Sequence, residues 1–299
     1  MRIQLLQEDE MLLKKSIFSL FFLFGCSAFL PAQTPEAEFN YPAAARRGHG
    51  TTLRVMSYNI LAERFNRKMR SVAERAPEIA KIIKTLAPDV AGLQETDEPW
   101  YPALSERIAP YKFAVDPYDT TLCAVIYDSR RFRQTGGGNF VFVTEELRCL
   151  RYTVLEEIKT GKKLIVTNTH WCLKPFMRLA NAVLMVRYIN ELQLEYPGVP
   201  IICTGDFNCS AQSAELIHFL KESGFSDAVE AAENVFNKAF FSAYSPVNRR
   251  SRAGWHIDHI IYSPGIKSLN AGLVASEEIY RASDHAPVIA DLEMPDAVK

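Results

Sequence analysis

The chain has 299 residues, of which 48% are hydrophobic and 23% are charged. Such a composition supports one large hydrophobic core and differs from that of a disordered chain. The 34 Lys and Arg residues nearly balance the 35 Asp and Glu residues, which leaves a net charge of -1. We therefore exclude a strongly basic protein that coats nucleic acid, and any recognition of phosphate has to be local.

An apolar segment near the N-terminus, residues 17–30, follows two lysines and leads into proline-rich sequence. The segment is too short to cross a bilayer comfortably, and the prolines argue against a buried helix. We predict that residues 1–33 are a signal peptide, so that the protein is exported to the bacterial periplasm or outside the cell. Acidic residues before Met11 fit a leader poorly, which suggests Met11 as the true start. A lipid anchor at Cys26 is an alternative form of export.

Residues 34–50 are rich in proline, alanine and small polar residues and lack an apolar period, which indicates a linker. Residues 51–295 then alternate strands and helices without a second linker, so we predict one folded domain. No stable protein partner is implied, and we expect a monomer. No CxxC pair is present, which excludes a zinc ribbon. A disulfide is possible, but we favour buried thiols at the five cysteines beyond the leader, Cys123, Cys149, Cys172, Cys203 and Cys209.

The apolar pattern predicts a strand over residues 53–58 and then a helix over 72–86, which Pro88 follows. Two longer helices are predicted at about residues 175–195 and 213–223. Further strands are predicted at residues 90–93, 121–127, 140–143, 152–158, 164–169, 201–204, 257–262 and 288–292. Many strands in hairpin-like succession with few helices indicate a mixed α/β sandwich rather than a regular doubly wound sheet.

Polar residues stand at or near the ends of these predicted strands. They are Asn59, Glu95, Asn168, His170, Asp206, Asn208, Asp258, Asp284 and His285. Singly, an Asp or Asn after a strand is more often a turn residue or a helix cap, and a lone His is commonly structural. The coincidence of carboxylates, amides and imidazoles at converging strand ends instead predicts one site. Its oxygen-rich ligands favour Mg2+ or Mn2+ over zinc.

Six motifs along the chain resemble those of the endonuclease/exonuclease/phosphatase superfamily. In order they are RVMSYNIL at 54–61, PDVAGLQE at 88–95, TNTHW at 167–171, GDFN at 205–208, IDHI at 257–260 and SDHAPV at 283–288. Each motif is weak, but six in the same order are specific, and they cover about residues 52–292. The first motif is most similar to the deadenylase branch, meaning the CCR4-type, nocturnin and angel proteins, and to bacterial secreted members.

The resemblance implies a DNase I-like fold, a four-layer α/β sandwich of two mixed β-sheets flanked by helices. It also implies a hydrolase of phosphate esters that depends on a divalent metal, Mg2+ or Mn2+. By position, Glu95 would be the principal metal ligand, with Asn59 and Asp284 beside it.

The same resemblance implies the catalytic residues. Asp206 would activate the attacking water, and Asn208 would hold that water or the phosphoryl oxygens. His285, bonded to Asp258, would lie against the scissile phosphate, and His170 would assist the phosphate or the leaving group. These residue types suit the chemistry, because displacement at phosphorus needs a base near water and donors that face the developing charge.

The substrate is less well determined by the sequence. We place Asn168, Trp171, Arg178, Arg249 and Arg252 as substrate-binding residues, although a solvated loop explains the two later arginines equally well. A phosphodiesterase or nuclease is the first expectation. A phosphomonoesterase, or a hydrolase of phospholipid or inositol-phosphate head groups, is the alternative, and a catalytically silent binding module is more remote. The substrate would accordingly be a nucleic acid, nucleotide, sugar phosphate or lipid head group.

Overall fold

The computed structural model describes residues 52–66, 69–114, 122–142, 148–237, 242–244 and 254–295. The predicted signal peptide at 1–33 and linker at 34–50 lie outside these residues and stay predictions. Among the helices of the described residues, none is long and apolar enough to cross a membrane.

The predicted helix and strand pattern is largely present. The helices are α2 (Val72–Leu86), α3 (Trp100–Ser105), α4 (Pro175–Glu195), α5 (Ala214–Ser223) and α6 (Glu277–Ala282), with a 3-10 turn η3 (Glu63–Phe65). The strands of the first half are β1 (Thr52–Asn59), β2 (Val90–Gln94), β3 (Tyr111–Phe113), β4 (Cys123–Asp128), β5 (Phe132–Phe142), β6 (Arg148–Glu157) and β7 (Lys163–His170). Those of the second half are β8 (Ile201–Asp206), β9 (Ser226–Asp227), β10 (Asn234–Phe236), β11 (Ala243–Tyr244), β12 (Gly254–Trp255), β13 (Asp258–Tyr262), β14 (Lys267–Leu273) and β15 (Val288–Glu293).

Two mixed sheets form the centre of the domain. One has the strand order β10-β14-β15-β1-β2-β4-β3, and the other has the order β5-β6-β7-β8-β13-β9, while β11 and β12 pair separately. In the first sheet β1 is parallel to β2 and antiparallel to β15. In the second sheet β7 is parallel to β8, and β13 is antiparallel to β8. The ends of β1, β2, β7 and β8 therefore carry the predicted polar residues.

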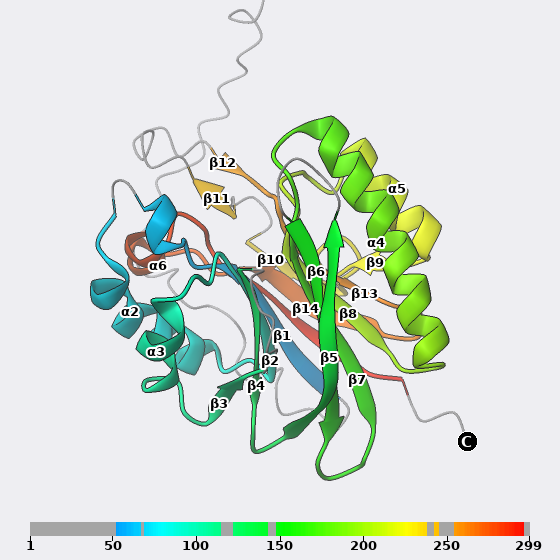
Figure 1. The fold of residues 1–299 in the computed structure, drawn as a ribbon, viewed down its shortest axis with the longest axis horizontal. Helices are drawn as coiled ribbons and strands as arrows, with labels where there is room; N and C mark the ends of the chain where they lie inside the picture. The colour runs from blue at the N-terminus through cyan, green and yellow to red at the C-terminus, as the bar shows by residue number, and fades with distance from the viewer. Residues whose placement is uncertain are drawn as a thin grey trace, which may run out of the picture. The chain divides into compact units, whose positions relative to one another are not determined.

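The alternation along β1 shows how the layers form. Leu53 and Val55 belong to a core that lies between the two sheets, whereas Met56 and Tyr58 pack on the outer side of the first sheet against α2. Helices α2, α3 and α6 cover that outer face, and α4 and α5 cover the outer face of the second sheet (Figure 1). This arrangement confirms the predicted four-layer α/β sandwich.

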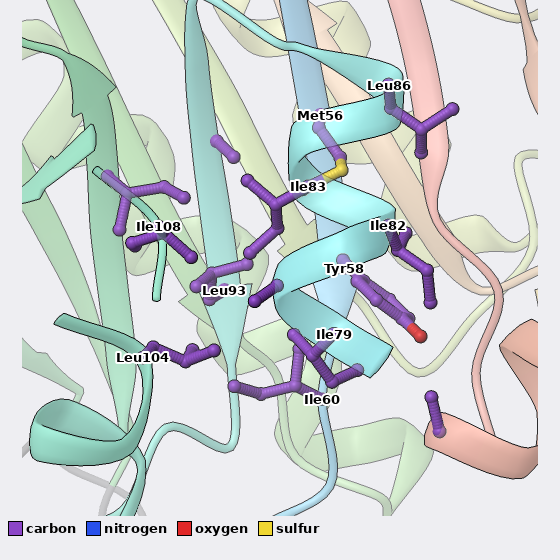
Figure 2. Close-up of a cluster of buried hydrophobic side chains, with 14 of the residues drawn as sticks. Met56, Tyr58, Ile60, Ile79, Ile82, Ile83, Leu86, Leu93, Leu104 and Ile108 are labelled. Atoms are coloured by element: carbon purple, nitrogen blue, oxygen red, sulfur yellow. The ribbon is translucent and has the colours of Figure 1, made fainter. Parts of the chain in front are cut away.

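Helix α2 has the bounds that the apolar period predicts. Ser71 caps its N-terminus in a capping box with Glu74, and the helix ends at Ala87, whose backbone is left-handed with a φ of 45°. Figure 2 shows Ile79, Ile83 and their neighbours pointing from the helix onto the first sheet. This packing holds β1 and β2, which carry Asn59 and Glu95 at their ends.

The sequence did not predict the short elements η3, α3, β3, β9, β10, β11 and β12, and it also missed β14 and α6. Strand β14 has a register shift between Ser268 and Asn270, which breaks the alternation of apolar residues. Helix α6 has only six residues, too few for a periodic pattern to be recognised. The five cysteines beyond the leader, Cys123, Cys149, Cys172, Cys203 and Cys209, are all buried, as expected.

Candidate active site

Most of the polar residues predicted at strand ends meet at one rim between the two sheets. Asn59 ends β1 and Glu95 follows β2 in the first sheet, whereas His170 ends β7 and Asp206 ends β8 in the second. The Asn59 amide nitrogen donates a hydrogen bond to Glu95 Oε1 at 3.2 Å and to Asp206 Oδ2 at 3.1 Å. One amide thus joins carboxylates from both sheets.

Glu95 is held in a strained backbone position, with a φ of 60° in the left-handed region. Its Oε2 accepts a hydrogen bond from the Ala62 amide at 3.1 Å. Burial raises the pKa of the Glu95 carboxyl, the hydrogen bonds from Ala62 and Asn59 oppose this rise, and the negative charge of Asp284 adds to it. A cation beside Glu95 would offset both the burial and the neighbouring charge.

The donor set fits a hard divalent cation. Carboxylate oxygens, which Mg2+ and Mn2+ prefer, are offered by Glu95 and Asp284, whereas the Asn59 amide oxygen accepts a hydrogen bond from the Leu61 amide at 3.0 Å. Asp284 Oδ1 is buried and has no hydrogen-bond partner among the described residues, so it has an unmet need for a donor or an ion. A second group, Asp206, Asp258 and His285, is fully buried and has its ligand atoms within 4.8 Å of one another.

His285 is paired with Asp258 as predicted. Its Nδ1 lies 2.8 Å from Asp258 Oδ2, and its Nε2 lies 3.8 Å from Asp206 Oδ2. Burial by itself lowers the pKa of His285, but the charge of Asp258, its hydrogen bond and the charge of Asp206 together raise that pKa well above the usual value. The two neighbouring carboxylates thus favour the protonated form of the ring.

The pKa of His170 is shifted in the opposite direction to that of His285. The His170 Nε2 lies 3.4 Å from Asp206 Oδ2, and its Nδ1 lies 4.0 Å from Glu95 Oε1. Burial lowers the pKa of His170 to about 4, although Asp206 opposes that change. The pKa values of the two imidazoles are thus shifted in opposite directions, and both rings lie within 4 Å of the same Asp206 carboxylate.

Asn208 lies in the tight turn after β8, with a left-handed φ of 52°. Its backbone amide donates to Asp206 Oδ1 at 3.0 Å, and its side-chain amide donates to the Trp171 carbonyl at 2.9 Å. The turn orients the Asp206 carboxylate. Asp206 and Asn208 therefore form the ordinary turn of an Asp-x-Asn sequence and also lie in the site. One amide hydrogen of Asn208 remains for a ligand.

Two serines in the site were not singled out from the sequence. Ser283 Oγ donates to the Asn59 carbonyl at 2.7 Å and accepts from the His285 amide at 3.2 Å. Ser57 Oγ accepts from the Gly205 amide at 3.0 Å and so links β1 to β8. Ser57 lies inside the first of the six motifs and Ser283 inside the last, and these positions could have identified both residues.

Three of the residues placed against substrate have other positions. Trp171 is fully buried and packs edge-on against Phe207, so its ring has no surface for a substrate. Asn168 is also fully buried, and its amide group donates to the carbonyls of Leu93 and Ala124 at 3.0 and 2.8 Å. It joins the two sheets. The burial of both side chains argues against direct contact with a substrate at these two positions.

Arg178 lies on α4 and is neutralised by Glu215 of α5, with 3.1 Å between Arg178 Nη2 and Glu215 Oε1. Its guanidinium also donates to the Leu173 carbonyl. The side chain therefore cross-links two helices, and its assignment to the substrate stays a prediction. Arg249 and Arg252 lie outside the described residues, and their assignment stays a prediction.

Comparisons with known proteins support the fold. Three of the solved structures that share it are from two Bacteroides species and from human. An endonuclease/exonuclease/phosphatase from Bacteroides vulgatus has a TM-score of 0.73 and 21% identity over 82% of this chain and 99% of that chain. A mannosyl-6-phosphatase from Bacteroides thetaiotaomicron has a TM-score of 0.68 and 21% identity over 80% and 99% of the two chains. The human nocturnin catalytic domain, with bound sulfate, has a TM-score of 0.59 and 18% identity over 81% and 94%.

A comparison with curated proteins finds no match. Residues 56–285, by contrast, match the sequence model of the Endonuclease/Exonuclease/phosphatase family. That range contains each of the site residues described above, from Asn59 to His285. The chain therefore belongs to the endonuclease/exonuclease/phosphatase family, whose members are phosphoesterase hydrolases.

Proposed function

We propose that this chain is a divalent-metal-dependent hydrolase of phosphate esters in which Asp206 accepts a proton from the attacking water. One observation carries the proposal. The Asp206 carboxylate is contacted by Asn59 at 3.1 Å, by His170 at 3.4 Å and by His285 at 3.8 Å. A buried carboxylate among such donors is well placed to orient and deprotonate water.

The neighbouring groups have complementary roles in this proposal. The His285 imidazolium, held by Asp258, faces the negative charge that develops on the phosphoryl oxygens. Neutral His170 donates a hydrogen bond to the phosphate or to the leaving oxygen, and the remaining Asn208 hydrogen orients the water. A divalent cation held by Glu95, Asn59 and Asp284 would polarise a phosphoryl oxygen.

Phosphodiesters are the first substrate class, because a neutral and a cationic imidazole suit a phosphate with a single negative charge. Phosphate monoesters are a second candidate. They are favoured by the similarity to the Bacteroides thetaiotaomicron mannosyl-6-phosphatase, which has a higher TM-score, 0.68, than nocturnin, at 0.59.

The test is hydrolysis of bis(4-nitrophenyl) phosphate and 4-nitrophenyl phosphate by the purified, EDTA-treated protein. We expect one ester to be cleaved only after Mg2+ or Mn2+ is added, and the Asp206→Asn variant to be inactive on it. A wider panel adds single-stranded DNA and RNA, nucleotides, inositol phosphates and sphingomyelin. If no ester is cleaved with either metal, the proposed function is wrong and a binding module is favoured.

A further inference from the structure

A pocket of about 600 Å³ opens beside Glu95, within the usual size range of small-molecule sites. Its lining includes Arg64, Thr96, Asp97, Glu98, Tyr101 and Leu122. Three of these residues follow Glu95 directly in the chain. The pocket is thus adjacent in the chain to the predicted metal ligand, which makes it a candidate site for the alcohol part of a substrate.

The pocket walls are built on the loops that hold Glu95. Both Asp97 carboxylate oxygens accept backbone hydrogen bonds, from the Glu63 amide at 3.2 Å and the Arg64 amide at 3.1 Å. The Thr96 amide donates to the Leu122 carbonyl at 3.0 Å. The loop after β1 and the loop after β2 are thereby fixed to each other, so the pocket is preformed.

The side chains of the pocket lining that remain available to a ligand differ in chemical character. Tyr101 packs against Phe113, with 4.9 Å between ring centroids, which fixes its ring at the pocket wall. Arg64 and Glu98 are both exposed and line the same pocket, and neither forms an ion pair with another described residue. They offer a strong donor, a strong acceptor and an aromatic face.

The charge of the lining argues against a second phosphate. Arg64 contributes one positive charge, whereas Asp97 and Glu98 contribute two negative charges, which leaves a net charge of -1 before Glu95 is counted. Another phosphate group would be repelled there. A neutral group with many hydroxyls would instead bind the carboxylate and the guanidinium at the same time.

We propose that this pocket binds a neutral polyhydroxylated ring, a hexose or a cyclitol, as the alcohol part of the phosphate ester. The ring face packs on Tyr101, Glu98 accepts hydrogen bonds from its hydroxyls, and Arg64 donates to them. This inference rests on the proposed function and names its substrate class. It applies to a monoester or a diester, since only the alcohol part is recognised.

The test compares two phosphates of equal charge and carbon number, a hexose 6-phosphate and hexyl phosphate. Each is used as a competitive inhibitor of the nitrophenyl ester that the protein cleaves, with myo-inositol 1-phosphate to separate a cyclitol from a hexose. We expect the preferred polyol phosphate to bind about tenfold more tightly than hexyl phosphate, in keeping with hydrogen bonds to charged groups. The Glu98→Gln, Arg64→Leu and Tyr101→Leu variants should each lower the ratio of polyol phosphate affinity to hexyl phosphate affinity.

Glu106→Gln is the matched control, because Glu106 is 78% exposed and does not line the pocket. It should leave both inhibition constants unchanged. Calorimetric titration of the same phosphates into the Mg2+-loaded protein gives the comparison without turnover. If the protein cleaves no ester, the proposed function is contradicted. The calorimetric affinities would still show whether the pocket prefers a polyol phosphate to hexyl phosphate. Equal affinity for polyol and hexyl phosphates, or an unchanged preference in all three variants, would overturn the inference.

Discussion

Asn59 and Asp206 are joined by a hydrogen bond of 3.1 Å although 147 positions separate them in the chain. The bond connects the end of β1 in one sheet to the end of β8 in the other. The site is therefore complete only when the two sheets are docked. Four predictions test the chemistry of this site and the packing that supports it.

Replacing Asp206 by Asn keeps the side-chain shape and one of its two acceptor oxygens but removes the base. We expect the turnover number to fall by roughly a hundredfold or more, the usual range for loss of an acid-base group. Steady-state kinetics on the cleaved nitrophenyl ester measures the effect, and an unchanged melting temperature shows that the fold is intact. Near-normal turnover would contradict the assignment of Asp206.

Replacing Glu95 by Gln removes the charge that would hold the cation. We expect the Mg2+ concentration for half-maximal activity to rise by about tenfold or more, because a carboxylate is replaced by a neutral ligand. EDTA should abolish the activity of the wild-type protein, and Mg2+ or Mn2+ should restore it. Titration of the EDTA-treated proteins with Mg2+ gives the comparison. Equal metal dependence of the two proteins would exclude Glu95 as the principal ligand.

Gly92 on β2 marks a close approach of the two sheets. A Cβ at this position would overlap Thr204 Oγ1 and would lie 2.7 Å from Asn168 Oδ1. Gly92→Ala should therefore lower the free energy of unfolding by about 1–3 kcal/mol, the cost of overpacking a core.

Gly136→Ala is the matched control for Gly92→Ala, since its nearest contact would be an ordinary 3.4 Å to Val154 Cγ2. Urea denaturation measures how much free energy of unfolding each of the two variants loses. If the two variants lose the same free energy, close packing between the sheets is not the cause.

A buried ion pair lies behind the site. His259 Nδ1 is 2.7 Å from Asp227 Oδ2, and its Nε2 is 2.9 Å from the Cys209 carbonyl. Burial lowers the pKa of His259, but Asp227 outweighs it and raises that pKa above the ordinary 6.5. Burial raises the pKa of Asp227, but His259 outweighs it and holds that pKa below the ordinary 3.8.

The contribution of His259 to stability is therefore complete below pH 6.5 and declines as the pH rises toward its folded pKa. The contribution of Asp227 is complete above pH 3.8 and is lost as the pH falls toward its folded pKa. We expect His259→Gln to cost about 3 kcal/mol near pH 5, because it leaves a buried carboxylate unpaired. The difference from wild type in urea denaturation should shrink between pH 6.5 and 9. A difference that stays constant over this range would show that His259 is not charged in the folded protein.

Much of the fold could be predicted from local patterns. Helix α2 has its predicted bounds because the features that set them are local in the sequence. These features are the apolar period, the Ser71 cap and the end of the helix before Pro88. The site residues Asn59, Glu95, Asp206 and His285 could likewise be identified, because each lies within one of the ordered motifs. Strand β14 could not, because its register shift removes the alternation on which such a prediction depends.

The sequence by itself determined which residue types stand at the strand ends, and with them a carboxylate-rich, metal-compatible site. Only the tertiary structure decided which of these side chains face the rim and which face inward. Trp171 and Asn168 follow the same strand pattern as His170, yet they are buried by contacts with Phe207 and Leu93 from distant parts of the chain. The charge states of His170 and His285 and the pocket beside Glu95 depend in the same way on burial and on neighbours. Those neighbours are set by how the sheets and loops pack, which no local pattern encodes.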